Sequence, residues 1–236
     1  MFRQIIALGS IYISLLVLGL GLSSYAYIKV KNIYNKYIGI PNFKNVTGVN
    51  VAKALLNRYG IFNVKVEIIG GNLTDKYDAK RNTIKLSDSV YSNSSITALG
   101  ISAHEVGHAI QHKEEYHYFK LRNIIAYCSS IISNSSHVII LLGLIFKILI
   151  LIKIGIIMFC VIVFINLFTI FVELNASERA RFLIKEVYSP NEEELYMINQ
   201  VLFAASLNYF ATMIIGLGSI LTIIKRRLNS IMRVLK

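Results

Sequence analysis

The sequence contains little of what marks several common protein classes. Its 236 residues include only two prolines, two cysteines and 16% charged residues. So few prolines, beside 14 glycines, exclude a disordered or collagen-like chain. The cysteines, Cys128 and Cys160, lie in apolar stretches and match no zinc-binding spacing, so we expect buried thiols. Hydrophobic residues make up 55% of the chain, more than a soluble domain of this length uses, which predicts a membrane protein.

Acidic residues are also scarce, and the formal net charge is +12. In a soluble protein this excess would suggest nucleic acid as a partner. Here Lys and Arg largely flank apolar runs, where they meet lipid headgroups, and the sequence has no Arg-rich block or RNA-binding signature. We therefore expect a lipid bilayer as a partner and no nucleic acid.

Four apolar runs are long enough to cross a hydrocarbon core of about 30 Å as helices. They predict transmembrane helices at 5–28, 127–146, 152–172 and 201–224. Lys147 and Lys153 interrupt the middle of the chain and are expected in a tight turn between the second and third spans. The chain would then be a multi-pass integral membrane protein.

The first of these runs has an alternative, a cleaved signal peptide. Such a peptide normally has an apolar stretch of about 7–15 residues followed by a small-residue cleavage site. The run 5–28 is longer, which favours an uncleaved anchor.

Four spans fix which polar segments share a side of the membrane. The insert 29–126 and the segment 173–200 lie on one side, and both termini lie on the other. Counts of Lys and Arg are similar on the two faces, so the orientation stays open. A site shared between the two segments is allowed by this topology.

The insert 29–126 reads as a small α+β unit. Residues 48–59 predict an amphipathic helix ended by Gly60, and the β-branched alternation of 61–69 predicts a strand. A second strand is expected at 82–86. A helix over 95–114 follows, with an N-cap among Asn93, Ser94 and Ser95.

This last helix carries the motif His104-Glu105-Val106-Gly107-His108. Residues i and i+4 of a helix share a face, so both imidazoles can bind one ion. Two imidazoles and a third ligand leave the fourth position of one Zn²⁺ open to water, whose pKa the metal lowers to about 7. Glu105 is placed to accept the proton of that water and return it to the leaving amine. The motif predicts peptide hydrolysis in a zincin-like unit.

The third zinc ligand must come from elsewhere in the chain. Gln111 and Glu114 stand where a metzincin would carry Gly and His, so that class is excluded. His112 shares the helix face but lies about 12 Å from His104 along the axis, too far for one ion. We expect a packing or supporting role for it.

Glu173 is the candidate we prefer, because it follows the third span on the side assigned to the zinc helix. Glu178, five residues on and pointing to another face, is the local alternative. Arg179 and Arg181 could instead pair with Glu173, which would then only mark the membrane boundary.

The chain resembles the bacterial membrane-bound neutral zinc metallopeptidases of the YugP-like family, distant relatives of the HtpX-like gluzincin proteases. The resemblance lies in A-H-E-V-G-H-A-I-Q-H (103–112), V-E-L-N-A-S-E-R-A (172–180), the shorter stretches 77–78 and 85–87, and L-F-A-A-S-L-N-Y-F-A (202–211). It implies a membrane peptidase in the bacterial cell membrane. In the related gluzincins an E-x-x-A-D segment supplies the third ligand, and this segment maps onto Glu173, Ala176 and Ser177. Ser177 departs from the relatives' Asp, so a carboxylate contact to a zinc histidine is lost or replaced by a hydroxyl.

These features predict a membrane-bound zinc endopeptidase that acts on unfolded or membrane protein segments. The strand 82–86 could form a sheet edge on which a substrate peptide is added as a further strand, or it could be a plain structural hairpin. The alternative function is a non-catalytic membrane adaptor in which zinc only stabilises the polar unit. The intact Glu105 favours the enzyme, because a structural site needs no general base.

Overall fold

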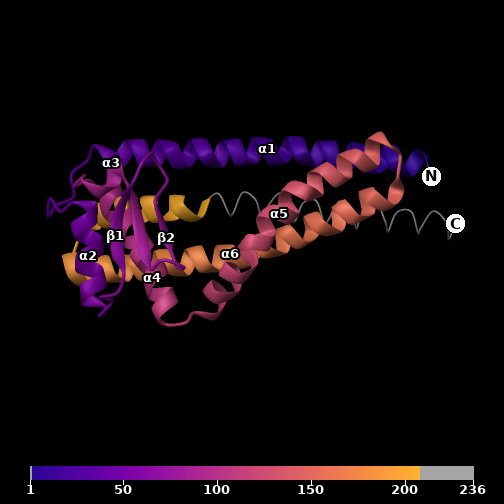
Figure 1. The fold of residues 1–236 in the computed structure, drawn as a ribbon. Helices are drawn as coiled ribbons and strands as arrows, with labels where there is room; N and C mark the ends of the chain where they lie inside the picture. Colours follow the sequence, from indigo (N-terminus) through magenta and orange to yellow (C-terminus); the bar gives the residue numbers. More distant parts are fainter. Residues whose placement is uncertain (1, 208–236) are drawn as a thin grey trace. The chain divides into compact units, whose positions relative to one another are not determined.

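The computed structural model describes residues 2–207, which form mostly helices and one small sheet (Figure 1). The elements are α1 (Phe2–Ile38), α2 (Gly48–Arg58), β1 (Lys65–Ile69), β2 (Lys76–Asp78), β3 (Thr83–Ser87), α3 (Asp88–Tyr91), α4 (Ile96–Lys113), α5 (His117–Ile145) and α6 (Leu149–Tyr188). Residues 192–207 are helical as well. This mixture fits the expected α+β class.

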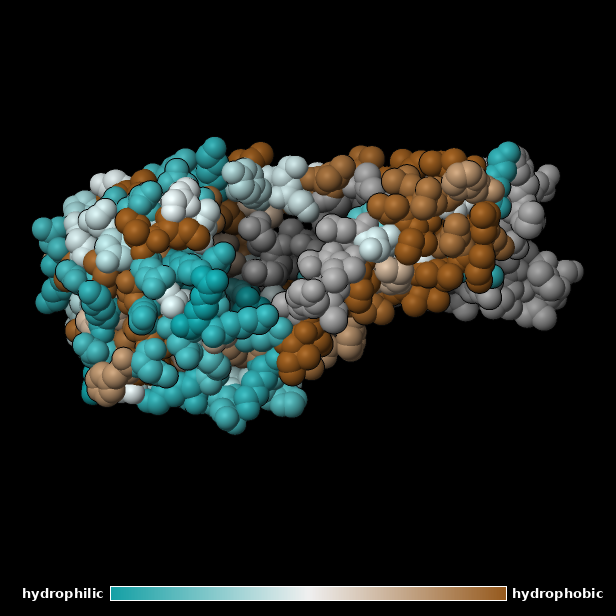
Figure 2. All heavy atoms as spheres, in the orientation of Figure 1, coloured by the Kyte–Doolittle hydropathy of each residue, from teal (hydrophilic) through white to brown (hydrophobic). Residues whose placement is uncertain are grey.

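The chain divides into two compact units. We call Tyr27–Lys120 with Ile170–Leu207 the sheet unit, and Leu121–Thr169 with the N-terminal residues up to Ala26 the helical unit. Figure 2 shows mainly hydrophilic residues on the visible surface over the sheet and mainly hydrophobic residues over the turn that joins α5 to α6. On this face, therefore, the surface over the sheet and the surface over the α5–α6 turn differ in hydropathy.

In the sheet unit the strand order is β1-β3-β2. β1 pairs parallel to β3, and β2 pairs antiparallel to it, with Tyr77 opposite Ile84. The central strand is buried at four of its five positions, whereas β1 and β2 are partly exposed. The β-branched and apolar residues of β3 thus form the inner layer against which the helices pack.

The core of the sheet unit lies between this sheet and helices α2 and α4. The apolar stripe of α2 contributes Val51, Ala52, Leu55 and Leu56, all buried, at the spacing expected of an amphipathic helix. α4 is buried along most of its length, including its polar residues. A helix enclosed in this way holds its side chains in fixed positions.

One expectation for this sheet needs correction, and one of its strands was not expected. The strand expected at 82–86 is β3, but it is the central strand and both its edges are paired, so it offers no edge to a substrate. β2 was not expected, because Lys76–Asp78 is too short to show alternation. Within the described residues, β2 has a neighbouring strand on one side only.

In the helical unit α5 and α6 form a closely packed hairpin. A Cβ at Gly155 would lie 2.4 Å from a side-chain carbon of Ile140, and one at Gly143 would lie 2.8 Å from the Ile152 nitrogen. The absence of side chains at these glycines allows the two helices to approach.

Lys147 stands in the connecting turn with φ 56°, as expected, but Lys153 lies within α6 and not in the turn. Cys160 of α6 is a free thiol and is partly buried.

The structure bears only in part on the four predicted spans. Within the described residues, α6 is the one helix long and apolar enough to cross a membrane, and the C-terminal part of α5, Ser135–Ile145, is a shorter apolar stretch. The first run, 5–28, lies in α1, which continues to Ile38, and 201–224 falls mostly outside the described residues. The third span does not end its helix at 172, because 173–188 contains neither Gly nor Pro and is rich in helix-forming residues.

Candidate metal centre

The local sequence of α4 determines where the motif residues point. The Ser95 hydroxyl caps the helix by accepting a hydrogen bond from the Ala98 amide at 3.1 Å. In its C-terminal half, α4 meets α6 so closely that a Cβ at Gly107 would lie 2.4 Å from the Ala176 carbonyl oxygen. Gly107 is therefore the residue that lets α6 approach the two histidines beside it.

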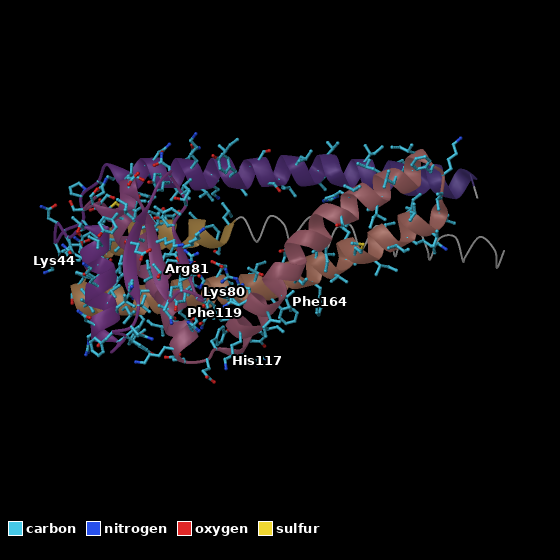
Figure 3. The ribbon with its side chains drawn as sticks, viewed as in Figure 1. Lys44, Lys80, Arg81, His117, Phe119 and Phe164 are labelled. Carbon is cyan, nitrogen blue, oxygen red and sulfur yellow. The ribbon has the colours of Figure 1, made fainter. Side chains whose placement is uncertain are left out.

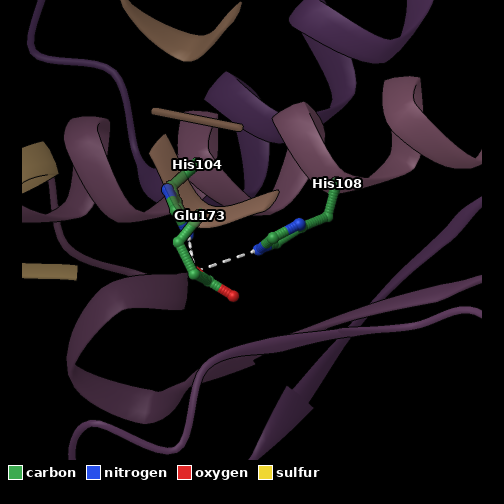
Figure 4. A group of neighbouring side chains, drawn as sticks. All are labelled: His104, His108 and Glu173. Atoms are coloured by element: carbon green, nitrogen blue, oxygen red, sulfur yellow. Dashed lines mark hydrogen bonds and ion pairs between the residues drawn. The ribbon is translucent and has the colours of Figure 1, made fainter. Parts of the chain in front are cut away.

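This approach brings His104, His108 and Glu173 together (Figure 4). Their possible ligand atoms all lie within 4.8 Å of one another. The Oε2 atom of Glu173 is 3.1 Å from His104 Nε2 and 3.5 Å from His108 Nε2. All three residues are buried, with 4–5% of their surface exposed. The three residues chosen from the sequence as ligands thus lie in one cluster.

Hydrogen bonds fix the outer nitrogen of each histidine. The Ser177 hydroxyl donates to the Leu202 carbonyl at 3.1 Å, so it accepts from His104 Nδ1, also at 3.1 Å. His108 Nδ1 lies 3.0 Å from Gln111 Oε1, an acceptor. Both Nδ1 atoms therefore carry a proton, and both Nε2 atoms face Oε2 of Glu173. Two neutral imidazoles and one carboxylate form a donor set that fits Zn²⁺.

The charge state of Glu173 suits a ligand. Burial by itself raises the pKa of this carboxyl, but the neighbouring His108 and His104 outweigh burial and hold the pKa well below its ordinary value. Glu173 lies just past the apolar stretch 152–172. Its side chain is thus ionised at neutral pH, as a metal-binding carboxylate must be.

Glu105 lies on α4 between the two histidines in sequence. Its side chain is 6% exposed, so it is enclosed in the same buried region of the helix. It follows His104 directly and precedes His108 by three residues, which places it on the flank of the helix face that carries the two histidines. Glu105 is not among the three residues whose ligand atoms cluster.

The other residues weighed from the sequence lie outside the cluster. Glu178 is exposed. His112 accepts or donates a hydrogen bond at Nδ1 with the Tyr77 hydroxyl, 2.8 Å away. His117 is exposed at the start of α5 (Figure 3), and His137 belongs to the helical unit, where its ring lies 6.1 Å from that of Phe159. The supporting role expected of His112 is consistent with its contact to β2.

An aromatic group that was not predicted from the sequence lies beside His108. The ring of Phe119 lies 5.9 Å from those of His108 and His112, and 6.4 Å from that of Tyr77. Burial, followed by the charge of Asp78, raises the pKa of Tyr77 to about 12, so its hydroxyl keeps its proton. This group joins β2 to α4, the helix that carries both histidines. No local signal marks Phe119, because it reaches the site from the next helix.

The contact of Gln111 with His108 was not predicted from the sequence, where Gln111 served only to exclude the metzincin class. Its position three residues after His108 is the signal that could have revealed it, because i and i+3 are neighbours on a helix. Its fully buried amide also contacts α6.

Comparison with known proteins gives the class and then the family. The buried set of two imidazoles and one carboxylate is of the kind that zinc enzymes use. The chain belongs to the family described as "Putative neutral zinc metallopeptidase", which matches residues 12–227. It is also 38% identical over 220 residues to the "Putative membrane protease YugP" of Bacillus subtilis (strain 168), an alignment covering 93% of this chain and 97% of that protein. No solved structure matches the chain.

Proposed function

We propose that the chain is a membrane-bound zinc endopeptidase in which His104, His108 and Glu173 hold one Zn²⁺. The observation that carries the proposal is the buried cluster of two imidazole nitrogens and one carboxylate oxygen within 4.8 Å. Such a set of three protein ligands leaves one position for water, which is typical of catalytic and not of structural zinc sites. When bound, zinc supplies Lewis acidity that lowers the pKa of water and polarises a carbonyl oxygen.

The residues of the chain then have distinct roles. The Glu105 carboxylate takes a proton from the attacking water and delivers it to the amine nitrogen that leaves when the peptide bond breaks. Ser177 and Gln111 hold the imidazoles of His104 and His108 by their Nδ1 protons. Glu105, Gln111 and both histidines are buried and Ser177 is partly buried, which limits the access of bulk water and strengthens the hydrogen bonds.

The membrane setting narrows the class of substrate. We propose that the apolar runs 5–28, 127–146, 152–172 and 201–224 cross the bilayer, with the polar segments 29–126 and 173–200 on one side. Glu173 then follows a span directly in the sequence. An enzyme whose metal ligand adjoins a span is suited to unfolded chains and to membrane protein segments, and we propose these as substrates.

The outer edge of β2 is the place where we expect the substrate backbone to bind. β2 is an edge strand, and its Tyr77 contacts His112 of the metal-binding helix, so a peptide added there would run beside α4. An added strand is held by backbone hydrogen bonds whose groups alternate along the peptide.

Substrates methylated at single backbone nitrogens test this binding mode. We expect methylation at every second position near the cleavage site to lower kcat/KM by about 2–10-fold, since each lost hydrogen bond is worth about 0.5–1.5 kcal/mol. Methylation at the intervening positions should have little effect. Equal losses at all positions, or none, would argue against strand addition. The measurement is kcat/KM for a matched series of peptides.

Removal of the metal tests the proposed function itself. The purified chain in detergent should cleave an unfolded polypeptide, lose this activity on treatment with a chelator, and regain it with Zn²⁺. Mg²⁺ should not restore cleavage, because it takes oxygen ligands and two of the three ligands here are imidazoles. Cleavage that persists in protein shown by metal analysis to be zinc-free would contradict the proposal.

A further inference from the structure

Gln111 joins the two helices that carry the candidate ligands. It lies on α4, its side chain is fully buried, and its three polar contacts reach both helices. The carbonyl Oε1 lies 3.0 Å from His108 Nδ1. The amide Nε2 donates to the Val172 carbonyl at 2.8 Å and to Asn175 Oδ1 at 3.0 Å. These two acceptors lie on α6 on either side of Glu173 in the sequence.

The network fixes which way the Gln111 amide points. Asn175 Oδ1 also accepts a hydrogen bond from Arg179 Nε at 2.7 Å, so this oxygen is held in place as an acceptor. The Val172 carbonyl can only accept. Gln111 must therefore present its NH₂ group to α6 and its carbonyl oxygen to His108. A reversed amide would face two acceptors with its own oxygen.

The two candidate histidines are supported differently. Ser177, the hydrogen-bond partner of His104, donates its hydroxyl proton to the Leu202 carbonyl in the segment 192–207. Gln111, the partner of His108, donates two hydrogen bonds from its amide nitrogen to α6, the helix that carries Glu173. Ser177 is itself a residue of α6, so the hydrogen-bond networks of both histidines reach from α4 to α6. Gln111 differs in that it lies on α4 and binds α6 at two points, Val172 and Asn175, on either side of Glu173.

We infer that Gln111 is a positioning residue that couples His108 to Glu173 and sets their spacing for the metal. It fixes the tautomer of His108, so that Nε2 faces the centre, and it holds α6 in register with α4. The inference rests on the proposed metal site but adds a residue that touches neither metal nor substrate. Partners of this kind orient metal ligands, and their loss lowers metal affinity by about 10–100-fold.

Two substitutions separate the two halves of this role. Gln111→Met keeps the length of the side chain but removes all three hydrogen bonds. Gln111→Glu keeps an acceptor for His108 Nδ1 but removes both donors to α6. Gln200→Met is the matched control, because Gln200 is partly buried in the same unit and is not one of the clustered residues.

The experiment compares zinc affinity, the visible spectrum of the Co²⁺-loaded protein and thermal unfolding of the metal-free protein, all on the full chain in detergent. We expect Gln111→Met to bind zinc about 10–100-fold more weakly and to shift the Co²⁺ spectrum. Gln111→Glu should bind zinc more tightly than Gln111→Met, yet both should lower the unfolding temperature of the metal-free protein. Gln200→Met should leave affinity and spectrum as in the unchanged protein.

The possible failures are distinguishable. If the unchanged protein binds no zinc, or if His104→Ala binds it equally well, the proposed metal site is wrong. If the unchanged protein binds zinc through His104 while Gln111→Met shows the same affinity and Co²⁺ spectrum, only the inference about Gln111 is wrong. A fall in unfolding temperature for Gln111→Met without a change in affinity or spectrum would also overturn it, because the residue would then be merely structural.

Discussion

Replacing Glu105 by glutamine is expected to lower kcat by about 10²–10⁴-fold while zinc stays bound. The amide has nearly the same size as the carboxylate, so it fits the buried place on α4, but it cannot accept a proton from water. Because Glu105 is not among the clustered ligands, its substitution leaves all three in place. The measurement pairs zinc content with the rate of cleavage of an unfolded polypeptide.

Glu67→Gln is the matched control, because Glu67 is an exposed carboxylate on β1. It undergoes the same chemical change away from the cluster, and we expect its kcat to be unchanged. A Glu105→Gln protein that still cleaves at the normal rate would remove Glu105 from the mechanism. Loss of zinc together with activity would instead make Glu105 part of metal binding.

Glu173→Ala is expected to have the largest effect on the metal. The carboxylate Oε2 faces both histidines at 3.1 and 3.5 Å, and alanine leaves two imidazoles to hold the ion alone. We expect zinc affinity to fall by more than the roughly 10–100-fold that follows loss of an indirect partner. Competition with a chromophoric chelator measures this affinity, and kcat should fall with it once zinc is limiting.

Glu178→Ala provides the control on the same helix. Glu178 lies five residues further along α6, is exposed, and is absent from the cluster. Its removal should leave zinc affinity unchanged. If Glu178→Ala weakens zinc binding and Glu173→Ala does not, the assignment of the third ligand is reversed.

Local patterns in the sequence were enough to predict most of the sheet unit. The amphipathic stripe of α2, the cap of α4 among Asn93, Ser94 and Ser95, and the alternation in 61–69 that contains β1 each depend on residues close together in the sequence. The order of the strands in the sheet does not depend on residues within one element. For this reason β3 was considered as a possible edge strand, whereas it is the central strand and β2 lies at the edge. The length of α6 was missed for a related reason, since the end of an apolar run need not be the end of a helix.

The candidate site shows the same division between local and distant information. His104 and His108 follow from spacing on one helix, and the structure places them side by side, with ring centres 4.8 Å apart. Glu173 lies 69 residues beyond His104, so its choice needed span topology and the family resemblance. The role of Gln111 depends on how closely α4 approaches α6 at Gly107 and Ala176, a distance that no spacing along the chain reveals.

The central claim is that the chain hydrolyses peptide bonds and does not merely bind proteins around a structural zinc. Trapping in membranes tests it most directly, by comparing the polypeptides that copurify with Glu105→Gln and with the unchanged protein. An endopeptidase should hold intact polypeptides in the variant, and the same polypeptides should carry new N-termini when the unchanged protein is present. Identical, uncut partners on both proteins would contradict the account and favour a membrane adaptor.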